Sequence, residues 1–445
     1  MRLTLPLRVL AALCLAIASA CASAALPIQH WQQPSGAQVY LVESRGIPMV
    51  DVQLDFDAGG RREPAAQAGL AGLTAAMTGK GLLARDGEPA MDENQLGEAW
   101  ADLGAGFGGD ANTDRMSFSL RSLTDPALLD KALHLAARQL GEPAFPTHVW
   151  ARERQRLSAS IREANTRPGT VAWRAYLASV YGGHPYGYDV TEETLARIQV
   201  DDMRRFFATH VLPCRAKVSI VGDVDRARAD AIASRLLVRL PQGNGCPPLP
   251  PVPDVPPLKD GALQAIPFQS AQAHVLIGQP GYKRSDPDYF PLLVGNYILG
   301  GGGLVSRLST EVREKRGLSY GASSYFSPGL HAGAFTVNLQ TRPDQARQAV
   351  QVARETVARF VAEGPTPEEL QAAKDFLIGG FPLRIDSNRK LLDNVAAIAW
   401  HGLPLDYLDT WTAQVAKVSR EDVRAALARK LQPERMVTVI VGGQP

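Results

Sequence analysis

One stretch of sequence occurs twice in this chain, and this repeat limits the folds that the chain can adopt. Residues 198–223 read IQVDDMRRFFATHVLPCRAKVSIVGD and align without gaps with residues 418–443, VSREDVRAALARKLQPERMVTVIVGG, at an offset of 220. Each copy predicts a helix capped near Asp201 or Glu421, then a proline and a buried strand that ends in Val-Gly. Because only two copies are present, the repeat indicates a duplicated domain rather than a solenoid.

A proline-rich segment separates the two copies. Residues 241–257, PQGNGCPPLPPVPDVPP, contain eight prolines, a composition that predicts an extended, semi-rigid linker. The linker divides the chain into an N-terminal domain, residues 28–240, and a C-terminal domain, residues 258–445. Both fall within the usual size range of a single domain.

The segment MVDVQLDFDAGG, which begins at Met49, alternates apolar and polar residues and predicts a strand. Its polar side chains, among them Asp51, Gln53 and Asp55, share one face, which we expect to lie in water. A strand with one wet face indicates an antiparallel or mixed sheet that is covered on one side. A long helix is expected to begin at residues 366–369, Thr-Pro-Glu-Glu, which form a capping box. We therefore expect each half to be an α+β domain, a mostly antiparallel sheet with helices packed on one face.

The N-terminal segment, residues 1–24, has the pattern of a signal peptide. Arg2 and Arg8 give a positive start, residues 9–18 form an apolar core too short to span a bilayer, and Ala22-Ser23-Ala24 fits a cleavage site. We expect an exported, periplasmic protein without a membrane span. Cys21 leaves a lipoprotein as an alternative, although the residue three positions before it is a small alanine.

Two cysteines remain after the signal peptide is removed, Cys214 and Cys246. In an oxidising compartment they can form a disulfide, or they can stay as two separate half-buried thiols. The sequence leaves both alternatives open because it does not give the distance between them.

Composition and motifs exclude several functions. Positive and negative residues are mixed along the chain with a net charge of +2, and no basic stripe typical of a nucleic-acid binder occurs. No two of the eight histidines lie within five residues of each other, so no helix face offers two imidazoles to one metal ion. The chain has no Gly-x-Ser-x-Gly elbow, and the glycines at 300–303 lack the Gly-Lys-Ser/Thr of a phosphate loop.

The segment VREKRGLSYGASSYF, residues 312–326, contains the most informative polar residues. Arg313 is expected at a helix end that Gly317 breaks, and Tyr320 follows on a strand. An Arg and a Tyr are donors suited to a carbonyl oxygen that gains negative charge in a transition state. Taken alone, the pair favours the simpler interpretation of a surface arginine and a sheet tyrosine.

Nearly the whole mature chain resembles the metallopeptidase family of pitrilysin, insulin-degrading enzyme and mitochondrial processing peptidase. The resemblance rests on the duplicated halves, the proline-rich linker, HPYG at residues 184–187 and LGGGGLVSRLSTEVREKRGLSY from residue 299. It implies two homologous α+β domains that together form a clam-shell half chamber.

In active members of this family, the helix that resembles residues 69–81 carries His-x-x-Glu-His. The two histidines bind zinc and the glutamate activates a water molecule. The matching positions here are Gly72, Ala75 and Ala76. A further zinc glutamate, seven residues after the Glu of a Glu-Arg pair, corresponds to Ser160. The resemblance therefore implies that this chain has lost its zinc site and has no cofactor of its own.

Family members also use an arginine and a tyrosine of the second half to bind the substrate carbonyl beside zinc, and Arg313 and Tyr320 match them. We therefore expect a non-catalytic subunit of a heteromeric zinc endopeptidase, which donates both residues in trans to a homologous zinc-bearing partner that acts on peptides. The alternative is a non-enzymatic peptide-binding or scaffold protein of the same fold. A self-sufficient peptidase is disfavoured because the ligands are missing.

Overall fold

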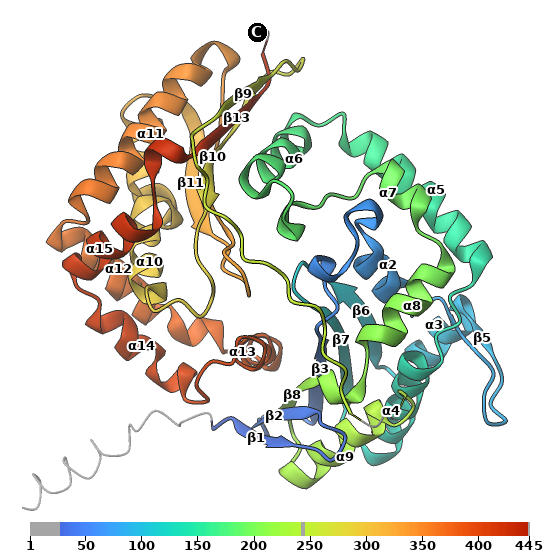
Figure 1. The fold of residues 1–445 in the computed structure, drawn as a ribbon. Coiled ribbons are helices and arrows are strands. Elements are labelled where there is room, and N and C mark those ends of the chain that lie inside the picture. Colours follow the sequence, from blue (N-terminus) through green and yellow to red (C-terminus); the bar gives the residue numbers. More distant parts are fainter. Residues whose placement is uncertain (1–26, 242–244, 444–445) are drawn as a thin grey trace, which may run out of the picture.

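The computed structural model describes residues 27–241 and 245–443. The predicted signal peptide lies outside them. The chain forms two halves, each a sheet with helices on its outer side, and the linker runs between the halves (Figure 1).

The first half contains a six-stranded sheet in the order β1-β2-β8-β3-β7-β6, in which only β2 and β8 pair in parallel. Its strands are β1 (Gln29–Gln32), β2 (Gln38–Glu43), β3 (Met49–Phe56), β6 (Gly106–Ala111), β7 (Met116–Leu123) and β8 (Lys217–Gly222). Its helices are α2 (Leu70–Met77), α3 (Glu93–Asp102), α4 (Pro126–Gly141), α5 (Thr147–Ala164), α6 (Pro168–Tyr181), α7 (Glu192–Arg197), α8 (Val200–His210) and α9 (Arg226–Leu237). A short hairpin pairs β4 (Gly81–Leu82) with β5 (Met91–Asp92).

The second half contains a five-stranded sheet in the order β11-β12-β10-β13-β9, in which only β13 and β9 pair in parallel. Its strands are β9 (Leu263–Ile266), β10 (Ala273–Pro280), β11 (Ser319–Phe326), β12 (Ala334–Thr341) and β13 (Val437–Val441). Its α-helices are α10 (Tyr289–Asn296), α11 (Ala346–Glu363), α12 (Pro367–Gly379), α13 (Asn388–His401), α14 (Tyr407–Lys417) and α15 (Arg420–Lys430). The Thr366–Glu369 capping box at the start of α12 is formed as predicted.

The two halves repeat the same strand order. The series β2-β8-β3-β7-β6 corresponds to β9-β13-β10-β12-β11, and in both the first strand pairs in parallel with the last strand of the half. Helix α8 and helix α15 occupy equivalent places in the two copies of the sequence repeat, and they begin and end at matching positions of the alignment. The prediction of a mostly antiparallel α+β fold in two related halves is confirmed.

One helix from each half packs on the inner face of the other half's sheet. Helix α6 packs on β10 and β13, where the hydroxyl of Tyr176 donates to the carbonyl oxygen of Phe335 at 2.8 Å. Helix α13 packs on β3 and β8, and Lys217 donates from Nζ to the carbonyl oxygen of Ala399 at 2.7 Å. Because of this exchange, the limits of 28–240 and 258–445 stay a prediction.

The prediction that one face of β3 lies in water is wrong. Asp51, Gln53 and Asp55 are all buried, because α13 covers the face that the alternating pattern assigned to water. The carboxylates are paired instead of hydrated: Arg121 binds Asp51 at 2.7 Å, and Arg115 binds Asp55 at 3.0 Å. Polar residues remain on this face because their partners lie within the same layer.

Contacts from the first half hold the linker along its described part. A disulfide joins Cys214, just before β8, to Cys246, which decides between the two alternatives left open for these cysteines. Further along, Arg62 donates to the carbonyl of Pro250, and His184 bonds the carbonyl of Pro253 at 2.9 Å.

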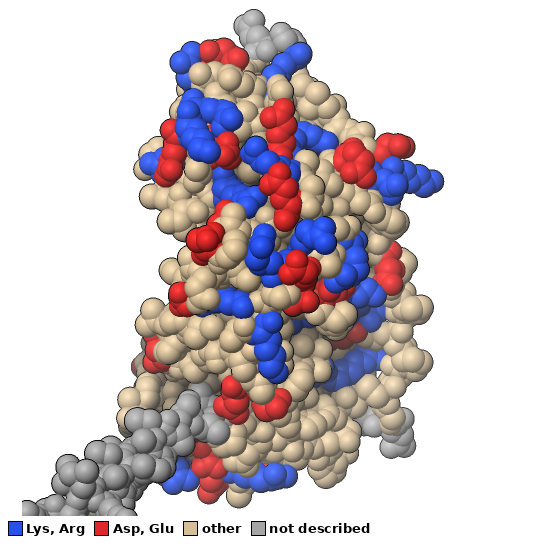
Figure 2. Space-filling view, turned by 90° about the vertical axis from the view of Figure 1, so that its left-hand side faces the viewer, with Lys and Arg blue, Asp and Glu red and all other residues tan. Residues whose placement is uncertain are grey.

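Charges of both signs are interspersed over the face shown in Figure 2, as they are mixed along the sequence. Over the described residues, the helices include none with the length and apolar character required to cross a membrane.

Candidate functional site

Arg313 and Tyr320 lie together in the structure. Arg313 belongs to a π-helical turn, Ser309–Glu314, and Tyr320 to β11, one of the two edge strands of the second sheet. The guanidinium carbon of Arg313 lies 5.0 Å from the centroid of the Tyr320 ring, a cation–π contact. Tyr320 is 85% exposed and Arg313 is half-buried.

The chain around the pair is anchored so that both side chains stay at the surface. Gly317 ends the turn with a φ of +61°, a conformation that favours glycine. Leu318 is buried, and its amide donates to the carbonyl of Val312 at 2.9 Å. The register of β11 against β12 shifts between Ser319 and Ala322, so Tyr320 falls within an irregular part of the strand. The predicted helix end, break and strand are therefore present.

Glu311 provides the charge balance within the same turn. Hydrogen bonds from Lys315 at 2.8 Å and Arg316 at 2.7 Å hold the pKa of the Glu311 carboxyl below its ordinary value. The guanidinium of Arg313 is not used in this network, and among the described residues neither it nor the Tyr320 hydroxyl has a hydrogen-bond partner.

The positions that match the zinc motif lie on α2 as predicted, but they face different surroundings. Ala76 is exposed and Gly72 is half-buried, and a Cβ atom at Gly72 would meet no other atom within 4 Å. Ala75, at the position of the water-activating glutamate, is fully buried. Positions 72 and 76 of α2 therefore have space beside them, whereas position 75 is enclosed by the protein.

Glu63 caps the N-terminus of α2. Its carboxylate accepts hydrogen bonds from the amides of Gly69 at 2.7 Å and Ala71 at 2.8 Å. Burial raises the pKa of Glu63 to about 7, although the two amides oppose this rise. Sequence reasoning missed this residue, since a capping glutamate so far ahead of its helix leaves no local signature.

The Glu-Arg pair on α5 lies close to the end of α2. Glu153 approaches Lys80 at 3.9 Å, and Lys80 follows closely after α2 in the chain. Although burial opposes it, hydrogen bonds from Arg156 and Arg152 hold the pKa of Glu153 below its ordinary value. Ser160 lies further along the same helix, about 10 Å along its axis, and is exposed.

The residues at these positions do not fit a zinc ion. Glycine and alanine offer no donor atom at positions 72, 75 and 76, and a hydroxyl at Ser160 replaces the carboxylate. Among residues 27–241 and 245–443, no three histidine, cysteine, aspartate or glutamate side chains converge so that they could hold a metal ion.

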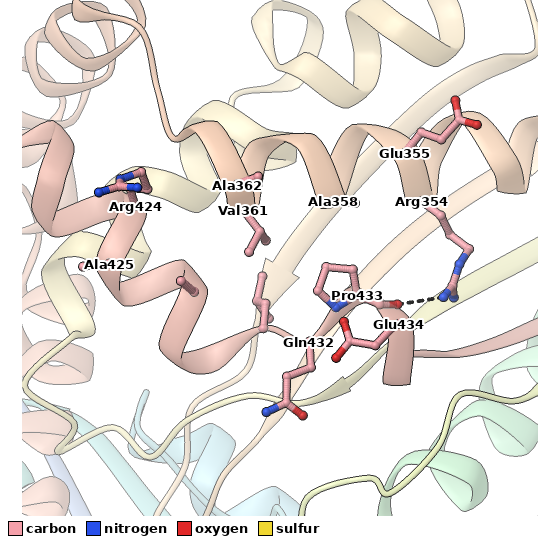
Figure 3. Close-up of a pocket in the computed structure, with 12 residues that line it drawn as sticks. Arg354, Glu355, Ala358, Val361, Ala362, Arg424, Ala425, Gln432, Pro433 and Glu434 are labelled. Atoms are coloured by element: carbon pink, nitrogen blue, oxygen red, sulfur yellow. Dashed lines mark hydrogen bonds between the residues drawn. The ribbon is translucent and has the colours of Figure 1, made fainter.

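A cavity of about 850 Å³ lies on the second half between α11 and α15 (Figure 3). Alanines such as Ala358 and Ala425 form part of its lining, and Arg354 at its edge donates to the carbonyl of Pro433 at 2.7 Å. None of the residues predicted from the sequence to form a site lines this cavity.

Comparisons with known proteins agree with the fold. A family model described as the peptidase M16 inactive domain matches residues 197–377. The crystal structure of a peptidase M16 inactive domain from Pseudomonas fluorescens has a TM-score of 0.87 and 34% identity, and the match covers 94% of this chain and 98% of that one.

Two relatives from other bacteria carry different names. A Streptomyces coelicolor protein named as an uncharacterized zinc protease is 29% identical over 301 residues, which are 65% of this chain and 64% of that protein. A Helicobacter pylori protein named non-peptidase homolog YmxG is 25% identical over 407 residues, 90% of each chain. The chain therefore belongs to the peptidase M16 family as a homologue of the inactive type.

Proposed function

We propose that this chain is the non-catalytic subunit of an exported, heteromeric zinc endopeptidase that hydrolyses peptides. A homologous partner chain would bind zinc and supply the base that activates water. This chain would contribute one wall of the chamber and two donors, Arg313 and Tyr320, for the substrate carbonyl.

The observation that supports this proposal most directly is the state of these two side chains. The Tyr320 ring is 85% exposed, so packing against the chain gives little reason to keep an aromatic residue there. The guanidinium of Arg313 and the hydroxyl of Tyr320 lie side by side with their hydrogen-bonding capacity unused among the described residues. Two free donors held together are the arrangement that an oxyanion requires.

The two donors would act where charge develops. As a peptide carbonyl is attacked, its oxygen gains negative charge, and donors already in position stabilise that oxygen more than the ground-state carbonyl. The guanidinium would supply a permanent charge, and the hydroxyl would supply a short directional bond. Neither donor activates water, so the chain alone would not hydrolyse peptides.

The test is Tyr320→Phe in this chain, assembled with an unmodified zinc-bearing partner that co-purifies from the native host. Loss of one preorganised donor should lower turnover by about 10² to 10³ while association stays intact. Tyr297→Phe is a matched control, because the Tyr297 ring stacks on Phe376 at 4.9 Å and its hydroxyl has no hydrogen-bond partner in the described part of the chain. If Tyr320→Phe and Tyr297→Phe both keep full turnover on several peptides, the role of the pair is refuted.

A non-enzymatic peptide-binding protein is the second candidate, and one observation favours it. Strand β6 is an edge strand of the first sheet, at the opposite side from β1. Its segment GFGGDA carries mostly small side chains. Its free edge presents backbone groups to which an extended peptide can add as a further strand. Peptide binding by the chain alone, with no partner recovered from the native host, would favour this candidate.

A further inference from the structure

A second cavity, of about 560 Å³, lies where the two halves meet. Its walls come from residues 112–115 between β6 and β7, from Trp173 and Tyr181 of α6, from residues 327–329 after β11, and from the end of α13 at His401. The volume lies within the range of pockets that hold small molecules. The exchange of α6 and α13 is what brings these segments together.

Arg115 provides the cavity with a cation that is only partly used. Its Nη1 donates to the buried carboxylate of Asp55 at 3.0 Å and to the carbonyl of Ala396 at 3.4 Å. The guanidinium carbon lies 5.6 Å from the centroid of the Trp400 ring, which fixes the position of the group. Within the described residues its Nε and Nη2 have no partner and remain available as donors.

His401 provides a neutral donor beside this cation. Burial lowers the pKa of His401 to about 4, and the nearby charges of Arg284, Arg115 and Lys217 act in the same direction, while Asp114 opposes them. The imidazole is therefore neutral at pH 7 and carries one N–H group. Over residues 27–241 and 245–443 this ring has no hydrogen-bond partner.

Positive charge around His401 exceeds negative charge. The carboxylate of Asp114 is already bound by the Tyr186 hydroxyl at 2.6 Å and the amide of Leu330 at 2.9 Å. Arg284 donates to a tyrosine hydroxyl and Lys217 to backbone carbonyls, and in the described part of the chain neither contacts a carboxylate. An anion that enters the cavity would meet unused donors in a positive field.

We propose that this cavity binds the terminal carboxylate of a peptide, with Arg115 and His401 as donors and the rings of Trp173 and Tyr181 against the last side chain. Trp173 is 37% exposed, which leaves an apolar surface free for contact. A small inorganic anion would leave this aromatic wall and most of the volume empty. The site goes beyond the proposed function, because it needs this chain alone and no zinc.

The experiment titrates the purified chain at pH 7 with N-acetyl-alanyl-phenylalanine, whose last side chain is the aromatic one, and with the same dipeptide as its carboxamide. The acid should bind at least about ten times more tightly than the amide. The carboxylate accepts charge-assisted hydrogen bonds, whereas the neutral carboxamide accepts weaker ones. His401→Leu, which removes the donor, should lower the affinity for the acid by about fivefold. Arg115→Gln should do the same, with folding checked by circular dichroism because Asp55 would lose its partner.

Arg424→Gln is the matched control. It removes one positive charge from the lining of the other cavity, the one between α11 and α15 in Figure 3, and should change neither affinity. Equal affinity for acid and amide, no binding of either at millimolar concentration, or unaltered affinity for the acid in the His401 variant would each overturn the proposal. Inorganic phosphate binding as tightly as the acid would also overturn it, because the aromatic wall would then play no part. As no partner is present, a negative result leaves the subunit proposal standing.

Discussion

Glu63 makes the stability of the helix α2 depend on pH. Its side chain accepts two backbone hydrogen bonds at the start of the helix and is 9% exposed. Because burial disfavours the carboxylate, the pKa of Glu63 rises from 4.5 to about 7 in the folded chain. The unfolded chain loses this proton near pH 4.5, whereas the folded chain keeps it until about pH 7. The free energy of unfolding should therefore fall as the pH rises through this window.

The two pKa values define the size of the effect. At about 1.4 kcal/mol per pH unit, the interval from 4.5 to about 7 corresponds to about 3 kcal/mol of stability. This is an upper limit, because the positive end of the α2 dipole also favours the carboxylate. Glu63→Gln removes the titration and keeps one of the two acceptors, so it adds a cost of about 1 kcal/mol that does not vary with pH.

The assay is urea unfolding of the full chain and of Glu63→Gln at intervals from pH 4.5 to pH 8. The difference in unfolding free energy between the two proteins should change by up to about 3 kcal/mol across the series, in favour of the variant at high pH. Glu98→Gln, an exposed residue on α3, serves as the control and should run parallel to the unmodified chain. A difference between the chain and Glu63→Gln that stays constant to about 0.5 kcal/mol would refute the reasoning.

Three further outcomes are expected. Gly72→Ala should raise the unfolding free energy by about 0.5–1 kcal/mol, because the added Cβ meets open space on a helix. Gly69→Ala should lower the unfolding free energy, because φ is +101° at this residue and the added Cβ would lie 3.1 Å from a side-chain carbon of Val190. Replacing Cys214 and Cys246 together by alanine should cost up to about 4 kcal/mol in urea unfolding, as expected for a closed loop with a separation of 32 residues. The purified chain should contain far less than one zinc per chain by elemental analysis, and restoring His-x-x-Glu-His on α2 should give weak metal binding at best, since the third protein ligand, at Ser160, and its supporting shell are still missing.

The sequence repeat was enough to predict that the chain has two related halves, and the structure extends the repeat to the whole strand order. Local pattern predicted β3, the capping box at Thr366 and the break at Gly317. It failed for the polar face of β3, because the helix that covers this face, α13, belongs to the other half of the chain. The alternation of apolar and polar residues shows that one face of a strand is polar. Only the tertiary structure shows whether water or another element lies against that face.

At the site, the sequence predicted which residues are present and which are missing, but not their surroundings. The spacing of Arg313 and Tyr320 predicted a turn and a strand, and the structure adds that the two side chains touch. Nothing in the sequence indicated that Ala75 is fully buried while Ala76 is exposed, because both are small residues in one helix. The cavity at His401 was missed for the same reason as the contact of α13, since its walls come from distant segments.

The exchanged helices also limit how the chain can present its inner surface. The apolar side chains of α13 that pack on the first sheet, Leu391, Leu392, Val395 and Ile398, are 0–4% exposed. At about 1.5–3 kcal/mol for each fully buried side chain, lifting α13 from the sheet costs on the order of 10 kcal/mol before the contacts of α6 are counted. Such an opening would be populated in roughly one molecule in 10⁷. A peptide that reaches the inner surface must therefore enter at the rim of an already formed half chamber. Under the proposed function, this rim is the surface that a partner subunit would close.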